Sequence, residues 1–132
     1  MTTLEDPGVQ ALLAKPNFAV VSTKGQDGTI HSAVVWVDVE DGRLAINSAV
    51  GRKWPTDLER NPTITVLVYD LSNPYEYVEV RGRATPRLEG AEEHIDRLAK
   101  KYMDADSYPF RKEGEQRITF LVDADRVVHR KG

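Results

Sequence analysis

The sequence lacks several features that would assign it to a class of protein at once. It contains no cysteine, which excludes disulfide bonds, thiolate nucleophiles and thiol ligands for metals. No apolar run reaches the roughly 18 residues of a membrane-spanning helix. The opening stretch MTTLEDPGVQ has neither the basic start nor the apolar segment of a signal peptide. We therefore expect a cytoplasmic enzyme or binding protein with no membrane partner.

The chain also lacks a strong charge of either sign. It has 18 basic and 21 acidic residues, for a formal net charge of −3. General binding to nucleic acid or to an anionic membrane needs an overall basic surface or a strongly clustered basic patch. We therefore expect no nucleic-acid partner, and any anion-binding site must be local.

The residues that are present are typical of one folded domain. Hydrophobic residues make up 40% and charged residues 30% of the 132 positions, which are ordinary values for a globular protein. A chain of this length is large enough to form its own core. We predict a single domain over residues 1–132.

The hydrophobic pattern predicts a mainly β fold. Residues 7–14 have the spacing of a short amphipathic helix, with Asp6 as its cap. A longer helix is predicted at about 89–102. Six or seven strands are predicted at 17–23, 30–39, 44–49, 64–70 and 73–86 and, as two strands, within 117–130. Because the helical crossovers of a parallel sheet are missing, we predict one antiparallel barrel.

The familiar catalytic patterns are missing. His31, His94 and His129 lack the short spacing of a metal site, and no cysteine assists them. A Ser-His-Asp triad stays open because triads assemble in space, although no serine lies in a Gly-x-Ser-x-Gly context. Neither Gly-x-Gly-x-x-Gly nor a P-loop is present. Such a small set of reactive side chains is typical of a protein whose bound cofactor does the difficult chemistry.

One connector, GRKWPTDLERNP at residues 51–62, combines groups that suit an anion. Arg52 and Lys53 are adjacent, and they follow a strand that ends in asparagine and serine. A short helical turn beginning at Pro55 or Thr56 would add unpaired backbone amides. Two interpretations stay open: a local phosphate site, or a solvated basic turn next to a capped helix.

Four aromatic residues allow two interpretations each. Trp36 and Trp54 suit either the core or contacts with a cofactor. Tyr75 and Tyr77 share one predicted strand face with a glutamate and an arginine. A face that is both aromatic and charged suits either a dimer interface or the wall of a polar-rimmed cleft.

Taken in order, these segments resemble the split-barrel flavin and deazaflavin oxidoreductases, the superfamily that also contains pyridoxamine 5′-phosphate oxidase. The resemblance is carried by NFAVVSTKGQDGTIHSAVVWV, GRKWPTDLERNPTITVLVYD, NPYEYVEVRGRA and YPFRKEGEQRITFLV, which span nearly the whole chain. The combination of GRKWPTDLERNP with NPYEYVEVRGRA is similar to the actinobacterial branch that uses the 8-hydroxy-5-deazaflavin coenzyme F420. The resemblance implies an antiparallel split β-barrel that forms a homodimer, with two cofactor sites along the subunit interface.

The same resemblance implies which residues bind the cofactor. It places one strand alongside the tricyclic ring and a polar and basic group at the phosphate. The implied residues are His31, Val34, Val35 and Trp36 at the ring, Asn47, Ser48, Arg52 and Lys53 at the phosphate, and Trp54, Pro55 and Thr56 in the continuing loop. We also predict that Tyr75 and Tyr77 belong to the cofactor site, where either could donate a proton or line the substrate pocket. Many relatives have a lysine and then an arginine–asparagine pair where this chain has Trp54 and then Thr56-Asp57, so fewer cations meet the phosphate.

We therefore expect an F420-dependent oxidoreductase that transfers a hydride between the reduced deazaflavin and an unsaturated or conjugated small molecule. An FMN-dependent oxidase or reductase stays open, because both cofactors share a tricyclic ring and a ribityl phosphate. So does a non-enzymatic barrel that stores the cofactor, binds haem through a histidine or binds no ligand. The sequence assigns no catalytic residue and no metal ligand.

Overall fold

The chain forms three helices and seven strands in a computed structural model that describes all of residues 1–132. The helices are α1 (Pro7–Ala14), α2 (Lys53–Arg60) and α3 (Ala91–Met103). The strands are β1 (Ala19–Lys24), β2 (Ile30–Val35), β3 (Val37–Glu40), β4 (Arg43–Ala49), β5 (Thr63–Asp70), β6 (Asn73–Arg87) and β7 (Arg117–Lys131). Every strand pair is antiparallel, which confirms the predicted mainly β class.

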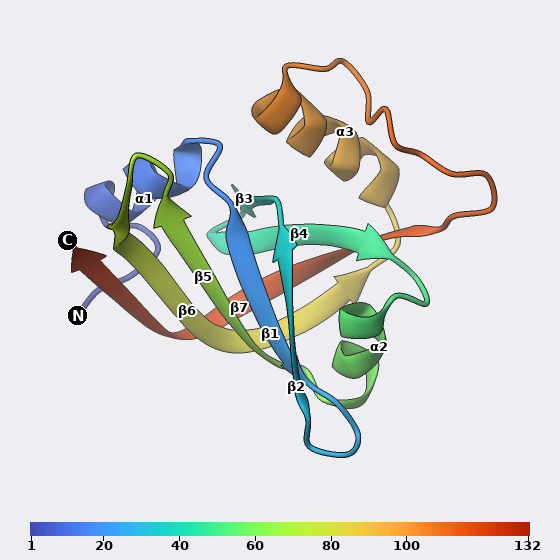
Figure 1. Cartoon of the computed structure of the whole chain (residues 1–132), viewed down its shortest axis with the longest axis horizontal. Coiled ribbons are helices and arrows are strands. Elements are labelled where there is room, and N and C mark those ends of the chain that lie inside the picture. The colour runs from blue at the N-terminus through green and yellow to red at the C-terminus, as the bar shows by residue number, and fades with distance from the viewer.

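The order of the strands explains why the sheet curls. The order is β2-β1-β5-β6-β7-β4-β3, so the two edge strands, β2 and β3, are consecutive in the chain. Only Trp36 separates them. The sheet must therefore bend until its two edges meet, which produces the half-closed barrel in Figure 1. The split between the two edges opens next to Trp36.

The prediction of a single strand over residues 30–39 is wrong, because the chain forms two strands there, β2 and β3, which meet at Trp36. The amide of Val37 donates to the hydroxyl of Tyr102 in α3 at 3.1 Å, not to a neighbouring strand. The same hydroxyl donates to the carbonyl of Asn17, before β1. Helix α3 thus holds the point at which the chain leaves one sheet edge and joins the other.

The carboxyl-terminal segment is one continuous strand, β7, where two strands were predicted. The register shifts between Arg81 and Gly82 of β6, which face Arg126 and Ala124, so Asp125 is an extra residue in β7. Such a bulge bends a strand without ending it. A Cβ atom at Gly82 would lie 2.0 Å from the carbonyl oxygen of Asp123, so this close approach of the two strands requires glycine.

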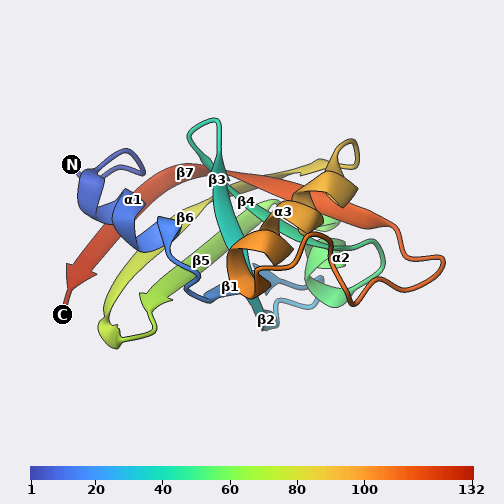
Figure 2. The ribbon, with the colours of Figure 1, turned by 90° about the horizontal axis from the view of Figure 1, so that it is seen from above.

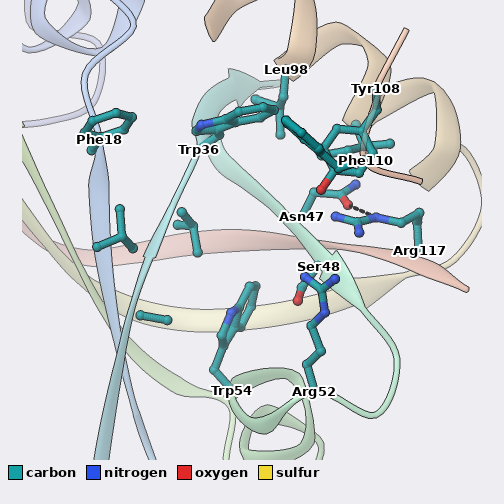
Figure 3. Close-up of a pocket in the computed structure, with 14 residues that line it drawn as sticks. Phe18, Trp36, Asn47, Ser48, Arg52, Trp54, Leu98, Tyr108, Phe110 and Arg117 are labelled. Atoms are coloured by element: carbon teal, nitrogen blue, oxygen red, sulfur yellow. Dashed lines mark hydrogen bonds between the residues drawn. The ribbon is translucent and has the colours of Figure 1, made fainter. Parts of the chain in front are cut away.

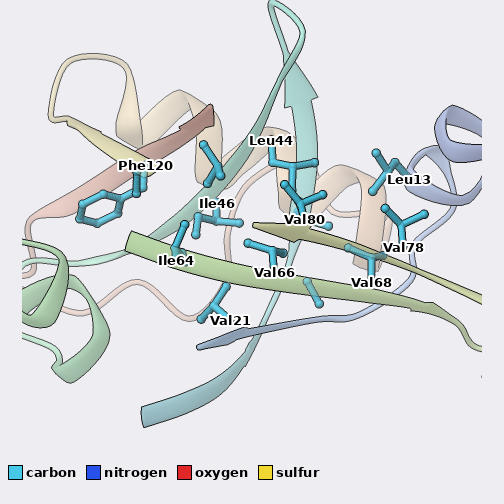
Figure 4. Close-up of a cluster of buried hydrophobic side chains, with 14 of the residues drawn as sticks. Leu13, Val21, Leu44, Ile46, Ile64, Val66, Val68, Val78, Val80 and Phe120 are labelled. Atoms are coloured by element: carbon cyan, nitrogen blue, oxygen red, sulfur yellow. The ribbon is translucent and has the colours of Figure 1, made fainter. Parts of the chain in front are cut away.

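The core lies on the concave face of the sheet, where valine, isoleucine and leucine side chains meet two aromatic rings (Figure 4). Val66 pairs with Val21 on one side and with Val80 on the other, so a row of valines crosses three strands. Helix α1 covers one end of the sheet, and α2 and α3 lie toward the other (Figures 1 and 2).

The amino-terminal helix follows its prediction in extent but not in its cap. Val9, Leu12 and Leu13 are buried, as the spacing predicts. Asp6 occupies the cap position, but its carboxylate makes no capping bond with the helix. It accepts a hydrogen bond from the amide of Thr3 instead.

Candidate functional site: a pocket at the split of the barrel

A pocket of about 390 Å³ lies beside the split of the barrel, within the range of small-molecule sites. Its walls come from the residue before β1, the end of β2, the end of β4, the start of α2, one face of α3, the loop before β7 and the first residue of β7 (Figure 3). The lining residues are Phe18, Ala33, Val34, Val35, Trp36, Asn47, Ser48, Arg52, Trp54, Ile95, Leu98, Tyr108, Phe110 and Arg117. The lining is mostly apolar, with its polar groups on β4, α2 and β7.

Three rings form one side of the pocket, and we call Trp36, Tyr108 and Phe110 the aromatic wall. Trp36 stacks on Tyr102 with ring centres 5.1 Å apart and planes at 8°. Tyr108 meets Trp36 edge-on at 6.0 Å, and Phe110 meets Tyr108 in the same way at 5.7 Å. Burial raises the pKa of Tyr102 to about 12, so its hydroxyl stays protonated and keeps its donor role at the junction.

In contrast to the apolar aromatic wall, a second group of side chains at the pocket is charged. It consists of Arg52, Glu115 and Arg117, and we call it the arginine–glutamate cluster. Glu115 lies just before β7 and accepts hydrogen bonds from both arginines, 3.0 Å from Arg52 Nη2 and 2.8 Å from Arg117 Nη1. Arg117 is only 4% exposed, and its guanidinium carbon lies 5.0 Å from the centre of the Tyr108 ring. Arg52 is about half-exposed. The pocket therefore holds two guanidinium groups whose positions one carboxylate fixes.

Glu115 is ionised in this setting. Burial opposes its ionisation, but the hydrogen bond and charge of Arg117, with the charges of Arg52 and Lys112, outweigh that effect. The pKa of Glu115 therefore lies below its ordinary value.

A buried chain of hydrogen bonds stands behind the cluster. Asn47 Oδ1 accepts from Arg117 Nε at 3.0 Å, and Asn47 Nδ2 donates to the Ala91 carbonyl at 3.0 Å. His94 lies 2.9 Å from Thr119 Oγ1 through Nδ1 and 2.9 Å from Asp38 Oδ1 through Nε2. This order resembles a catalytic triad, but Thr119 and His94 are wholly buried and cannot reach a substrate. These hydrogen bonds instead hold the Asn47 side chain in place, and Asn47 in turn holds Arg117 in place.

Helix α2 begins at Lys53, earlier than the predicted start at Pro55 or Thr56. Arg52 is its cap residue, and the first helical bond runs from the amide of Thr56 to the carbonyl of Arg52. Pro55 thus falls in the first turn, where a backbone N–H has no intrahelical partner to lose.

Asp57 fastens α2 to the sheet. It is 1% exposed, and its carboxylate accepts from Thr23 Oγ1 at 2.9 Å and from His31 Nδ1 at 2.8 Å. The ammonium group of Lys53 lies 3.5 Å from the other carboxylate oxygen. Burial opposes the charge of Asp57, but these hydrogen bonds and the nearby cation prevail and lower its pKa.

Replacing Asp57 with asparagine is expected to lower the free energy of unfolding near neutral pH by about 2 kcal/mol. A carboxyl whose pKa is lower in the folded chain stabilises the fold fully above its unfolded pKa of about 4 and loses that contribution as the pH falls further. The variant should therefore lose less stability than the wild type between about pH 5 and pH 3. Urea unfolding over that pH range measures the loss of stability of each protein, with Glu59→Gln on the exposed side of α2 as the control. Parallel pH profiles for the wild type and Asp57→Asn would contradict the assignment.

The comparisons with known proteins agree with this architecture. The sequence profile described as pyridoxamine 5′-phosphate oxidase matches residues 6–130. The chain belongs to the pyridoxamine 5′-phosphate oxidase family. Its curled seven-stranded sheet is the split barrel that the sequence predicted for this family. No curated protein sequence matches the chain.

Solved structures share the fold of this family member. One named F420 reductase is 22% identical with a TM-score of 0.79, over 90% of this chain and 94% of its own. A conserved hypothetical protein from Mycobacterium tuberculosis is 18% identical with a TM-score of 0.75, over 96% and 84%. General Stress Protein 26 from Bacillus anthracis is 21% identical with a TM-score of 0.69, over 91% and 88%. At these identities the likeness shows a common fold.

Two classes of feature are not found in this member of the pyridoxamine 5′-phosphate oxidase family. None of its three helices has the length and apolar character to cross a membrane. No three histidine, aspartate or glutamate side chains gather closely enough to hold a metal ion.

The structure brings together about half of the site residues predicted for this family member. Those that line the pocket are Val34, Val35, Trp36, Asn47, Ser48, Arg52 and Trp54. His31, Lys53, Pro55 and Thr56 lie close by in β2 and α2 but do not line it, since His31 and Lys53 face Asp57 and the Thr56 hydroxyl donates to the Arg52 carbonyl. Tyr75 and Tyr77 lie toward the far end of β6, away from the segment that pairs with the start of β7.

Sequence reasoning missed the other half of the pocket. The missed residues are Phe18, Ala33, Ile95, Leu98, Tyr108, Phe110 and Arg117. A signal was present in the predicted loop at 103–116, where Tyr108 and Phe110 are the large rings in an otherwise polar stretch. Two aromatic side chains in a polar loop favour a site over a plain connector.

Proposed function

We propose that the chain is an oxidoreductase that binds coenzyme F420 in this pocket and transfers a hydride between the reduced deazaflavin and an unsaturated or conjugated organic substrate. The observation that carries the proposal is the presence, in one pocket, of two arginines and a largely apolar, aromatic lining. The likeness to a structure named F420 reductase supports the same choice of cofactor.

The groups present suit the parts of this cofactor. A guanidinium group binds a phosphate through paired hydrogen bonds, which is the role we assign to Arg52 and Arg117. Trp36 and Trp54 stand on opposite sides of the pocket in Figure 3 and offer flat apolar surfaces for a tricyclic ring. The donor set therefore fits a ring joined to a phosphate.

The protein's own contribution is binding and orientation. The deazaflavin, when bound, supplies or accepts the hydride. The aromatic wall keeps water from one side of the pocket, and the buried chain behind Asn47 holds Arg117 still, so the phosphate is bound in a fixed position. Lys53 is assigned a smaller role than Arg52 because its ammonium group faces Asp57.

We further propose a homodimer formed through the convex face of the sheet. A cross-strand row on that face runs Val34, Val20, Leu67, Glu79 and Val128, and the paired Tyr69 and Tyr77 lie in the next row. Apart from Glu79 these side chains are apolar or aromatic, and all of them are exposed or half-exposed. A row of this kind across five strands is typical of a surface that another subunit covers. A sedimentation mass equal to that of one chain would contradict the dimer.

Titration with F420 and with FMN, followed by fluorescence, tests the choice of cofactor. We expect F420 to bind more tightly than FMN. The reverse order would mean that the cofactor is FMN and not the deazaflavin. Replacing Arg52 with alanine should weaken F420 binding by about 1–3 kcal/mol, because a charge-assisted hydrogen bond to the phosphate is lost.

Arg60→Ala provides a matched control for the Arg52 experiment. Arg60 is exposed in the last turn of the same helix and does not line the pocket. It should leave the affinity for F420 unchanged. Equal affinities for wild type and Arg52→Ala would show that the phosphate binds elsewhere.

A further inference from the structure

The carboxylate of Glu115 lies at the centre of the arginine–glutamate cluster. Its Oε1 atom accepts from Arg117 and its Oε2 atom from Arg52, so each oxygen binds one guanidinium group. The side chain is 8% exposed, which places it behind the two arginines and outside the pocket lining. Glu115 therefore acts on a ligand through the arginines and through its charge.

The three side chains of the cluster sum to a small charge, and Lys112 adds a weaker positive field on Glu115 from outside the cluster. Arg52 and Arg117 contribute two positive charges, and Glu115 removes one. The next cation along the chain, Lys53, lies 3.5 Å from the Asp57 carboxylate and adds no net charge. Behind the cluster, Asn47 and Thr119 are neutral. The cluster thus presents two guanidinium groups with a net charge of one.

We propose that Glu115 is a specificity-determining residue that sets this net charge at one, so that the pocket selects a ligand with a singly charged phosphodiester over one with a doubly charged phosphomonoester. The inference rests on the proposed function in that it takes the arginines as the phosphate site. The new element is that one carboxylate, that of Glu115, determines the choice between the two phosphate types.

The second negative charge of a phosphomonoester is unfavourable at this cluster. A phosphomonoester carries about −1.5 to −2 charges at neutral pH, whereas a phosphodiester carries one. The first negative charge of a ligand is balanced by the net charge of the cluster. The second is not, and it is also repelled by Glu115, which stays ionised because two guanidinium groups hold it. FMN has a monoester, and F420 has a diester because lactyl and glutamyl groups follow its phosphate.

A set of three flavins with the same ring isolates this effect. Riboflavin has no phosphate, the 5′-phosphate methyl ester of riboflavin is singly charged, and FMN is doubly charged. Fluorescence titration gives the affinity of each for wild type, Glu115→Gln, Glu115→Asp and Glu113→Gln. Glu113 is an exposed residue of the same loop and serves as the charge-matched control.

In the wild type we expect affinity to rise from riboflavin to the methyl ester and to be lower for FMN than for the methyl ester. In Glu115→Gln the affinity for FMN should rise about tenfold relative to that for riboflavin, with a smaller rise for the methyl ester. Glu115→Asp keeps the charge and should keep the wild-type order, as should Glu113→Gln. Melting temperatures show whether each variant is folded.

Three outcomes would overturn the proposal. Equal changes for all three flavins in Glu115→Gln, or the same profile in Glu115→Asp as in Glu115→Gln, would show that Glu115 only supports the structure. Binding of none of the flavins would also refute it. A separate F420 titration of the wild type tests the proposed cofactor: no binding of F420, with the expected flavin profile, would remove that cofactor and leave the role of Glu115 in place.

Discussion

Replacing Phe120 with alanine is expected to lower the free energy of unfolding by about 3–5 kcal/mol. Phe120 is 1% exposed, pairs with Ile46 across the sheet, and has its ring centre 5.5 Å from that of Trp54. Its truncation leaves a cavity that the rigid sheet cannot fill. Because Trp54 lines the pocket, its loss of support should also weaken binding of a ring-containing ligand. Urea unfolding and fluorescence titration of the same preparation measure both effects.

Phe110→Ala is the matched control, because it makes the same deletion on the other side of the pocket. Phe110 is 58% exposed and lines the pocket from the loop before β7. It should change stability by no more than about 0.5 kcal/mol, as is usual at surface positions. Ligand binding should nevertheless weaken. A stability loss as large as that of Phe120→Ala would mean that the loop forms part of the core.

Replacing Arg117 with methionine is expected to cost about 3 kcal/mol of stability and to cause the largest loss of affinity for a phosphate-bearing ligand of any single change in the pocket. Methionine keeps much of the side-chain volume but no donor. Glu115 then retains Arg52 alone, and Asn47 Oδ1 loses the donor it bonds at 3.0 Å. Breaking a buried ion pair by removing one partner leaves an uncompensated charge, which is the source of the large cost.

The double variant Arg117→Met, Glu115→Gln separates the two effects. Removing the second charge should restore much of the stability, since no buried carboxylate is left with half of its partners. It should not restore binding, because the guanidinium group that we propose binds the phosphate is still missing. A double variant no more stable than Arg117→Met would show that the cost comes from lost packing against Tyr108.

The parts of the fold predicted from the sequence are those that local patterning determines. The predicted helix at 7–14 is α1, and the alternation over 73–86 predicted the long strand β6. The errors occurred where partners distant in the chain decide the structure. Nothing near Trp36 in the sequence shows that its two flanking segments pair with opposite edges of the sheet. The polar residues around Asp125 suggest a turn, whereas in the sheet they form a bulge opposite Gly82.

The same distinction applies to the pocket. Asn47, Ser48, Arg52 and Trp54 belong to one connected stretch, and the resemblance together with that stretch was enough to group them. Arg117 joins them only because β7 pairs with β4, and no spacing rule connects residues so far apart. Lys53 shows the converse, since it is adjacent to Arg52 in the sequence but faces Asp57.

The position of β7 in the sheet has a consequence for biosynthesis. This last strand lies between β6 and β4, and it is the only strand that links the β3–β4 hairpin to the others by backbone hydrogen bonds. A nascent chain still missing β7 holds two separate sheet fragments, and it lacks Arg117. The strand must therefore leave the ribosome before the pocket is complete, so any ligand of the pocket can stabilise the folded state only after β7 has been made.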